Sequence, residues 1–207
     1  NGARKAPEQD ITVWREAGPS WRIKDVQATR VNGQRVNVVV SADLPLVGAT
    51  YTMTYGISGS GEVIVEAKYL PGATALAMMP RVGTELVVSA GLEQFEWYGR
   101  GGETYIDRQF EPIGIYSSSV SAQFTDYPKP QENGNKTDVR WLTLTNTQGV
   151  GLRVEGVGGT FSAGASHFTK ADLEQAAYSF QLPRRPEIYL NVDAKQMGVG
   201  GINSWST

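Results

Sequence analysis

Alternating apolar and polar residues, broken by short turn signals, recur along most of this chain. Residues 21–31 and 34–44 are β-rich runs on either side of Asn32-Gly33, a dipeptide typical of a type I′ hairpin turn. The same alternation continues in the runs 49–57, 62–70, 84–92, 113–124, 138–147 and 151–157. Because a period of two places every second side chain on the same face of a strand, the pattern predicts an antiparallel all-β fold.

A single segment predicts a helix instead. Thr169 is a typical N-cap, and Asp172 follows three residues later, which is the spacing of a capping box. Helix-forming residues such as Leu173 come next, and Pro183 and Pro186 close the segment. The sequence therefore predicts one short surface helix beside the strands.

The length and composition favour one domain that covers residues 1–207. The chain is 40% hydrophobic and 10% aromatic, which is enough for a packed core. We find no linker, charge block or fixed-period repeat that would divide it. Trp97 and Trp141 each lie in an alternating strand pattern, and we expect both indoles to be largely buried.

The charge and the residue types exclude several classes of partner and cofactor. The net charge is −2, the pI is near 5.5, and no basic stripe is present, so nucleic acid and anionic membranes are poor partners. No apolar run is long enough to span a bilayer, and the N-terminus lacks a signal-peptide pattern. With no cysteine and a single histidine, His167, we expect no thiolate or multi-histidine metal site and no cofactor in this chain.

A polar loop over residues 126–141 is the first candidate for a binding function. Its two prolines favour extended backbone, and Gln131, Glu132 and Asn133 place hydrogen-bonding groups close together. Such a stiff loop could hold a sugar, whose hydroxyls suit amide and carboxylate partners. Alternatively, these side chains bond only to their own loop and to neighbouring strands, which is the commoner use of such residues.

Two other features have a chemical and a structural interpretation. His167 could be a general acid beside a carboxylate such as Glu132 or Asp172, or it could be a solvent-facing or helix-flanking histidine just before the N-cap. The glycines of residues 99–108 could suggest phosphate binding, but a strand pattern rather than a helix follows them, so we interpret this segment as a connecting loop. The carboxylates are scattered along the chain, and their spacing singles out no catalytic pair.

The C-terminal stretch 195–207 places one large aromatic residue, Trp205, among glycines. Together with other segments it carries a resemblance that covers nearly the whole chain from residue 13 onward. The segments are WYGRGGETYIDR (97–108), PQENGNKTDVRWL (130–142), FSAGASHFTKADLEQA (161–176), LPRR (182–185) and YLNVDAKQMGVGGINSW (189–205). In this order they resemble the C-terminal, small-chain domain of glycoside hydrolase family 2 β-galactosidases.

The resemblance implies a galactose-mutarotase-like supersandwich of antiparallel sheets, expected here to be trimmed at both ends. It also implies a large bacterial enzyme, soluble in the cytoplasm or the periplasm, that hydrolyses terminal β-D-galactosides with retention through a covalent galactosyl-enzyme. The two catalytic glutamates, and any Mg or Na ions, would lie on a TIM barrel of the same polypeptide. The implied partners are this barrel, the galactoside and, in a homo-oligomer, further copies of the chain.

The resemblance further implies that Trp205 reaches the mouth of the barrel and forms an apolar platform for the sugar. The loop with Gln131, Glu132 and Asn133 would lie on the same rim, and this chain alone would not be catalytic. Glycine neighbours suit Trp205 because they allow tight turns and close approach to another domain. The alternatives are a stand-alone carbohydrate-binding module, or an aldose epimerase that uses His167 as its acid.

Overall fold

The computed structural model of this chain describes residues 13–73, 76, 78–126 and 133–198. The chain divides into two compact units, Asn1–Met79 and Pro80–Thr207, which we call unit 1 and unit 2. Each unit is described by itself, and the expectation of a single domain over residues 1–207 stays a prediction. The described elements are mostly β, with three four-stranded antiparallel sheets and two short α-helices.

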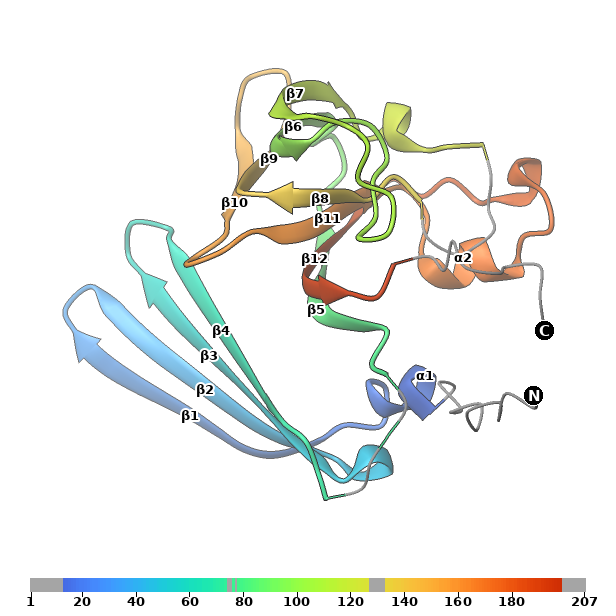
Figure 1. The fold of residues 1–207 in the computed structure, drawn as a ribbon. Coiled ribbons are helices and arrows are strands. Elements are labelled where there is room, and N and C mark those ends of the chain that lie inside the picture. Colours follow the sequence, from blue (N-terminus) through green and yellow to red (C-terminus); the bar gives the residue numbers. More distant parts are fainter. Residues whose placement is uncertain (1–12, 74–75, 77, 127–132, 199–207) are drawn as a thin grey trace, which may run out of the picture. The chain divides into compact units, whose positions relative to one another are not determined.

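Unit 1 is a four-stranded antiparallel meander in which sequential strands pair in the order β1-β2-β3-β4 (Figure 1). Its elements are α1 (Val13–Ala17), β1 (Arg22–Asn32), β2 (Arg35–Leu44), the 3₁₀ turn η1 (Pro45–Val47), β3 (Ala49–Ser58) and β4 (Val63–Leu70). The sequence analysis expected one helix only and missed α1. This helix has five residues, too few for a hydrophobic period to be recognised.

The first hairpin forms where the sequence predicted it, but the prediction of a type I′ turn is wrong. Asn32 still pairs with Arg35, so the two-residue loop is Gly33-Gln34. Gly33 is not among the glycines with positive φ, which a type I′ turn requires. Instead, the side-chain Oδ1 of Asn32 accepts a hydrogen bond of 2.8 Å from the backbone N–H of Gln34. This local Asx-type bond stabilises a different turn.

The period of two gives the sheet of unit 1 one apolar and one polar face. Val40, Met53 and Ala67 lie opposite one another across β2, β3 and β4, and so share a face. The neighbouring row, which points to the other face, includes Ser41, Thr52 and Lys68 in the same three strands. The apolar side of β1 is open, since Val26 is 55% exposed.

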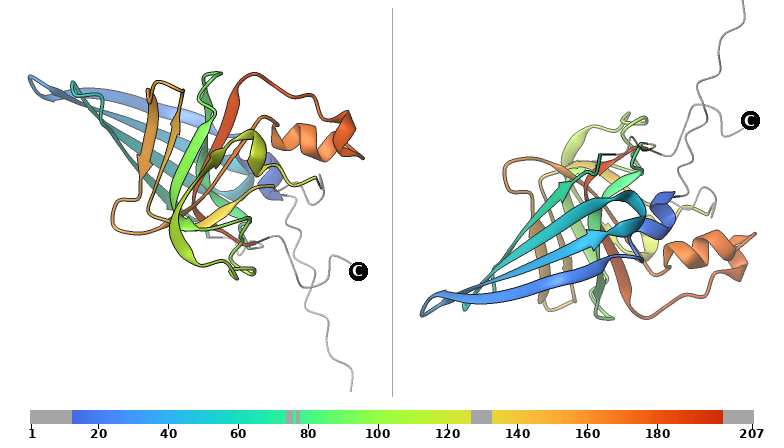
Figure 2. Two further views of the ribbon diagram at one scale, coloured as in Figure 1. Left: turned by 90° about the horizontal axis from the view of Figure 1, so that it is seen from above. Right: turned by 90° about the horizontal axis from the view of Figure 1, so that it is seen from below.

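Unit 2 contains two sheets, with strand orders β10-β9-β6-β7 and β5-β12-β11-β8 (Figures 1 and 2). The strands, in chain order, are β5 (Arg81–Val88), β6 (Gln94–Arg100), β7 (Ile113–Ser119), β8 (Lys136–Val139), β9 (Trp141–Thr145), β10 (Gly151–Glu155), β11 (Phe161–Ser166) and β12 (Ile188–Gln196). Neighbours in each sheet are antiparallel. The alternation analysis did not single out β11 or β12, in which small or buried residues obscure the period.

One hydrophobic core joins the two sheets of unit 2. Phe95 lies opposite Leu144, and Trp97 lies opposite Leu142, so that β6 and β9 present a continuous inward row. The facing sheet contributes its own buried residues to the same cluster, which are Val88, Val139, Phe161, Ala163, Ala165, Ile188 and Leu190. Unit 2 is therefore a two-layer β-sandwich, held by the burial of both inner faces.

The two tryptophans in strands have different environments. Trp97 is 3% exposed, as expected, and stacks on Tyr116 with a centroid separation of 5.5 Å. Trp141 is partly buried and less deeply placed than Trp97. It lies opposite Tyr98 on the outer face of the sheet, under the guanidinium of Arg153 at 4.7 Å. Alternation shows which residues share a face, but not which face another layer covers.

The predicted helix is confirmed as α2 (Lys170–Gln175), which both figures show to one side of the strands of unit 2. The capping box is complete. The Thr169 hydroxyl accepts from the backbone N–H of Asp172 at 3.1 Å, and the Asp172 carboxylate accepts from the N–H of Thr169 at 2.9 Å. The short 3₁₀ turns η2 (Ser121–Gln123) and η3 (Ser179–Gln181) complete the described elements of this unit.

Close packing of β5 on β12 yields a first prediction. A Cβ added to Gly83 would overlap the carboxylate of Asp193 and lie 2.6 Å from the carbonyl oxygen of Val192. The carboxylate is itself buried and lies 3.3 Å from the Nε of Arg81. We expect Gly83→Ala to lower the free energy of unfolding by about 1–3 kcal/mol, measured by urea denaturation with near-ultraviolet circular dichroism.

Gly33→Ala is the matched control, because a Cβ at this position meets no atom within 4 Å and the residue has no positive φ. Its denaturation midpoint should stay close to that of the wild type. Equal midpoints for Gly83→Ala and Gly33→Ala would contradict the packing of β5 on β12 described above.

Candidate functional site

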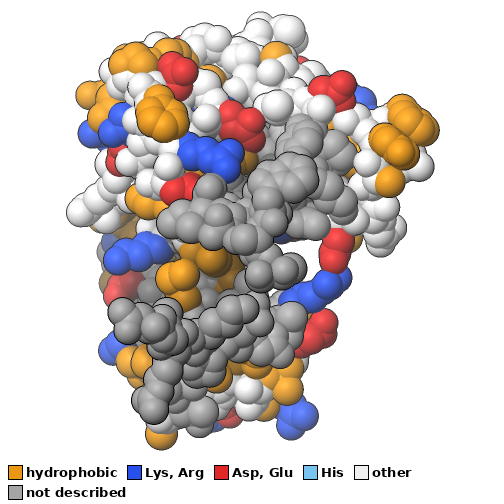
Figure 3. Space-filling model, turned by 45° about the vertical axis from the view of Figure 1, so that its right-hand side comes forward, with side chains coloured by type: hydrophobic (Ala, Val, Ile, Leu, Met, Phe, Trp, Pro, Cys, Tyr) orange, Lys and Arg blue, Asp and Glu red, His pale blue; other side chains and the backbone are white. Residues whose placement is uncertain are grey.

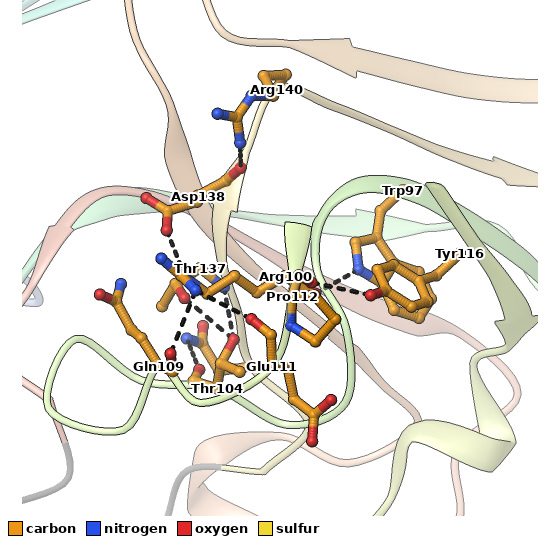
Figure 4. A network of polar contacts seen from close by, with 11 residues as sticks. Trp97, Arg100, Thr104, Gln109, Glu111, Pro112, Tyr116, Thr137, Asp138 and Arg140 are labelled. Carbon is orange, nitrogen blue, oxygen red and sulfur yellow. Dashed lines mark hydrogen bonds and ion pairs between the residues drawn. The ribbon is translucent and has the colours of Figure 1, made fainter. Parts of the chain in front are cut away.

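The loops that leave the sandwich at the β6 and β8 ends are held by buried and partly buried polar groups. Arg100, the last residue of β6, donates from Nε to the Asp138 carboxylate at 2.6 Å (Figure 4). Its Nη1 donates to the carbonyl oxygens of Glu111 at 2.9 Å and Gln109 at 3.2 Å. One guanidinium thus fixes the loop between β6 and β7 against β8. Asp138 has φ 53°, a left-handed conformation that is uncommon for non-glycine residues.

Glu103 joins this loop to the two ends of the polar loop. Its carboxylate accepts from the Tyr105 hydroxyl at 2.6 Å, the Thr125 hydroxyl at 2.6 Å and the backbone N–H of Gly134 at 3.0 Å. The carboxylate therefore bonds to residues on both sides of the segment 127–132. Such charge-assisted bonds are among the stronger contacts that a loop can make.

Asn133 closes the base of the polar loop. Its Oδ1 accepts from the backbone N–H of Thr125 at 2.7 Å, and its Nδ2 donates to the carbonyl oxygen of the same residue at 2.7 Å. The next amide side chain, Asn135, is buried and donates to the carbonyl oxygen of Thr104 at 2.8 Å. These bonds agree with the interpretation that polar residues of this region bond to their own loop and its neighbours.

Lys136 is the most deeply buried cation of the described chain, with 1% of its surface exposed. Its Nζ donates to the carbonyl oxygen of Gly134 at 2.9 Å and lies 5.1 Å from the ring centroid of Trp97. Burial lowers the pKa of Lys136 to about 8, against a smaller opposite effect of the negative charge on Glu103. A lysine that is charged near neutral pH thus lies against the main core.

His167 is buried and bonded at both ring nitrogens. Its Nε2 lies 2.8 Å from the Glu93 carboxylate, and its Nδ1 lies 2.9 Å from the carbonyl oxygen of Arg185. Glu93 also accepts from the hydroxyl and, at 2.7 Å, the backbone N–H of Ser121. Burial is the largest single effect on the pKa of Glu93 and raises it, but the bonds from Ser121 and His167 outweigh it and leave the pKa lowered.

The segment after α2 is held by a second ion pair. Arg185 donates from Nε and Nη2 to the two oxygens of Asp172, at 2.7 and 2.8 Å. These bonds, with those from Thr169, hold the pKa of Asp172 well below its usual range, and Asp172 raises the pKa of Arg185 in turn. The capping box therefore also positions the chain that leads into β12.

The structure brings together only some of the residues that the sequence singled out. Of the proposed sugar ligands, Asn133 lies at the base of the polar loop, whereas Gln131, Glu132 and Trp205 lie outside the described residues. The assignment of all four to substrate binding stays a prediction.

The solvent-facing interpretation of His167 is wrong, because the residue is 6% exposed. Its described carboxylate partner is Glu93 rather than Asp172. The sequence analysis missed Glu93, since no local pattern joins two residues so distant along the chain. It also missed the burial of Lys136.

The face of the molecule drawn in Figure 3 shows no concentration of one charge outside its grey atoms. Basic and acidic side chains are mixed there. Within residues 13–73, 76, 78–126 and 133–198, no group of three or more His, Cys, Asp or Glu residues could hold a metal ion. No helix in the same part of the chain is long and apolar enough to cross a membrane.

Taken together, these features describe a β-rich protein in which buried and partly buried polar groups hold the loops beside a β-sandwich in place. Comparison with known sequences gives the family. Residues 3–207 match the family described as the β-galactosidase small chain, and the chain belongs to this family.

Bacterial β-galactosidases are among the relatives that the chain resembles. The chain is 36% identical over 197 residues to the β-galactosidase of Priestia megaterium, an alignment that covers 93% of the chain. It is 33% identical over 199 residues to that of Lactobacillus delbrueckii subsp. bulgaricus, and 33% over 208 residues to that of Vibrio cholerae, which cover 95% and 97% of the chain. In each case it spans only 19% of the relative's length.

The burial of Lys136 predicts a pH dependence of stability. The pKa is about 8 in the folded chain and near the ordinary 10.5 when the lysine is unfolded and solvated. Between these values the unfolded state binds more protons, so the free energy of unfolding should rise with pH, by at most about 1.4 kcal/mol per pH unit. Lys136→Met should lose this rise in the free energy of unfolding. Urea denaturation at pH 7 to 10, in steps of about one pH unit, measures it.

Tyr51 and Tyr69, whose pKa values burial raises, titrate equally in both proteins, so the difference between the two curves isolates Lys136. Lys195→Met removes an exposed lysine of β12 and should keep the wild-type rise. Parallel curves for the wild type and Lys136→Met would show that Lys136 does not lose its proton in this range.

Proposed function

We propose that this chain is the C-terminal part of a retaining β-galactosidase that hydrolyses terminal β-D-galactosides. The observation that carries the proposal is the match of residues 3–207 to the β-galactosidase small chain, together with the alignments to bacterial β-galactosidases. Because the chain spans about a fifth of these relatives, we assign the catalytic step to another part of the same polypeptide. We assign to this chain a role in completing the rim of the active site.

The carboxylates at the described site support a role without catalysis. A retaining glycosidase needs two carboxyl groups about 5–5.5 Å apart that both face the sugar. Here Glu103 accepts three hydrogen bonds from protein groups, Asp138 binds Arg100, and Asp172 binds Arg185. Such groups hold loops in place, and a nucleophile bonded in this way would be a poor one.

We propose further that Trp205 supplies an apolar platform at the mouth of a catalytic TIM barrel, and that Gln131, Glu132 and Asn133 lie on the same rim. The support within the structure is indirect. Asn133 and Glu103 fix the base of the polar loop, so the loop leaves the sandwich at a defined place. A preorganised rim loses little conformational freedom when a sugar binds.

The finer fold assignment and the partners belong to the same proposal. We propose that the sheets form part of a galactose-mutarotase-like supersandwich, which the two-layer packing of unit 2 supports. The partners would be the barrel of the same polypeptide, the galactoside and further copies of the chain in a homo-oligomer. Any Mg or Na ions would be bound by the barrel, and this chain itself would need no cofactor.

The aldose epimerase is the weaker alternative. In the structure both ring nitrogens of His167 have protein acceptors, at Glu93 and at the carbonyl oxygen of Arg185. The imidazole thus has no nitrogen left to exchange a proton with a sugar. The stand-alone carbohydrate-binding module is separated from our proposal by experiment.

The chain by itself should not hydrolyse a chromogenic β-galactoside above the buffer control. Calorimetric titration with galactose and lactose should show no saturable binding with a dissociation constant below about 1 mM. One aromatic platform supplies at most about 4 kcal/mol of binding free energy. Tighter saturable binding would favour the carbohydrate-binding module. Hydrolysis that disappears on Glu132→Gln would overturn the assignment of the catalytic step to another part of the polypeptide.

In the whole β-galactosidase, Trp205→Ala should weaken galactoside binding and leave the chemical step intact. Aromatic stacking on a sugar is worth on the order of 1 kcal/mol beyond burial of area, and the area adds roughly 1–3 kcal/mol. We therefore expect kcat/KM to fall roughly 10- to 10³-fold, mainly through KM. Trp205→Phe should recover part of the loss because it keeps an apolar ring.

A purely structural role for Trp205 gives a different result. If the indole only fixes this chain to the barrel, Trp205→Ala lowers the melting temperature and the amount of folded enzyme, while KM stays unchanged. Measuring KM and the melting temperature on the same preparations separates the two roles. An unchanged KM in a destabilised variant rules out the platform.

A further inference from the structure

A small pocket of about 90 Å³ opens in unit 2 beside His167. It lies where η2, the end of β11 and the segment after α2 meet. For comparison, a dry cavity of roughly 150 Å³ holds a benzene molecule, and a single water needs roughly 10–15 Å³. The pocket therefore has room for a group of a few heavy atoms.

One part of the pocket wall is apolar. Phe124 and Phe168 line it and pack edge to face, with ring centroids 5.1 Å apart, and the buried Val120 lies beside them. An aliphatic stem placed against these side chains would leave water and contact carbon atoms on several sides. A bare inorganic anion would gain nothing from this wall.

The polar part of the wall offers hydrogen-bond donors. The exposed Arg184 donates from Nη2 to the Ser121 hydroxyl at 2.6 Å, which orients the guanidinium at the pocket. Ser166 accepts from the backbone N–H of Phe168 at 3.0 Å. In the described part of the chain no acceptor is recorded for the Ser166 hydroxyl proton or for the other N–H groups of Arg184.

The charges around the pocket also favour an anion. Two basic residues line it, His167 and Arg184, and His167 has a carboxylate partner in Glu93. Arg184 has no carboxylate partner among the described residues. Glu93 is not among the lining residues, and its oxygens are engaged by Ser121 and His167, so within the described residues no carboxylate is paired with Arg184.

We propose that this pocket binds a carboxylate on a short apolar stem. The carboxylate accepts from the Arg184 guanidinium and the Ser166 hydroxyl, and the stem lies against Phe124 and Phe168. Charge-assisted bonds from a planar guanidinium suit the two oxygens of a carboxylate. Two sources share this chemistry, a free short-chain acid and an acidic side chain from another part of a β-galactosidase polypeptide.

His167 makes the proposal easy to test. It is the only histidine of the chain and it lines the pocket, so its ring protons give an unambiguous nuclear magnetic resonance signal of binding. Titration of the 207-residue chain with propionate should shift this signal saturably, with a dissociation constant in the millimolar range. Propionamide, which has the same shape but no charge, should shift it far less.

Arg184→Gln should weaken propionate binding by about tenfold, because it removes the charged donor from an exposed residue and leaves the core intact. Phe168→Ala should weaken it through loss of the apolar wall. Arg153→Gln removes one positive charge from β10, outside the pocket, and should bind propionate as the wild type does. Melting temperatures of all variants show whether each is folded.

The pocket assignment is overturned if propionate leaves the His167 signal unchanged, if propionamide binds equally well, or if Arg184→Gln binds as tightly as the wild type. The source of the carboxylate follows from the same titration on a whole β-galactosidase that carries this sequence. Retained binding identifies a free short-chain acid as the ligand. If propionate binds only after a Glu or Asp elsewhere in the polypeptide has been replaced, that acidic side chain is the occupant of the pocket.

Discussion

The inward row of β6 and β9 is the contact on which the rest of unit 2 depends. Trp97, at its centre, packs on Phe95 at 4.8 Å and stacks on Tyr116, while its Nε1 donates to the carbonyl oxygen of Arg100 at 2.8 Å. One indole thus joins the core to the residue that anchors the neighbouring loop. Removing the indole would leave a large cavity in the core and would also release this loop.

Polar anchoring follows from this buried platform. The ammonium of Lys136 lies over the Trp97 ring, and Arg100 reaches Asp138 from the end of the same strand. Buried charges are costly unless they are hydrogen-bonded, and here each has a protein partner. Loops whose bases are held in this way suit the proposed role at the rim of an active site.

The proposed function and the carboxylate pocket place two kinds of recognition on one chain. The polar loop and the C-terminal segment would serve a sugar, whereas Arg184 and Ser166 would serve an anion beside His167. The first proposal rests on family membership and the second on geometry within unit 2, so either can fail without the other. Both use loops positioned by the sandwich, which is where binding residues are commonly found.

Local sequence determined the strands with clear alternation, the first hairpin and the capping box of Thr169 and Asp172, because each depends on neighbouring residues. The order of the motifs along the chain was sufficient to indicate the family. Only the tertiary structure decided which face of a strand is covered, so that Leu142 lies in the core whereas Trp141 is only partly buried. It also decided that His167 meets Glu93, 74 residues away, since the fold, and no local pattern, brings such groups together.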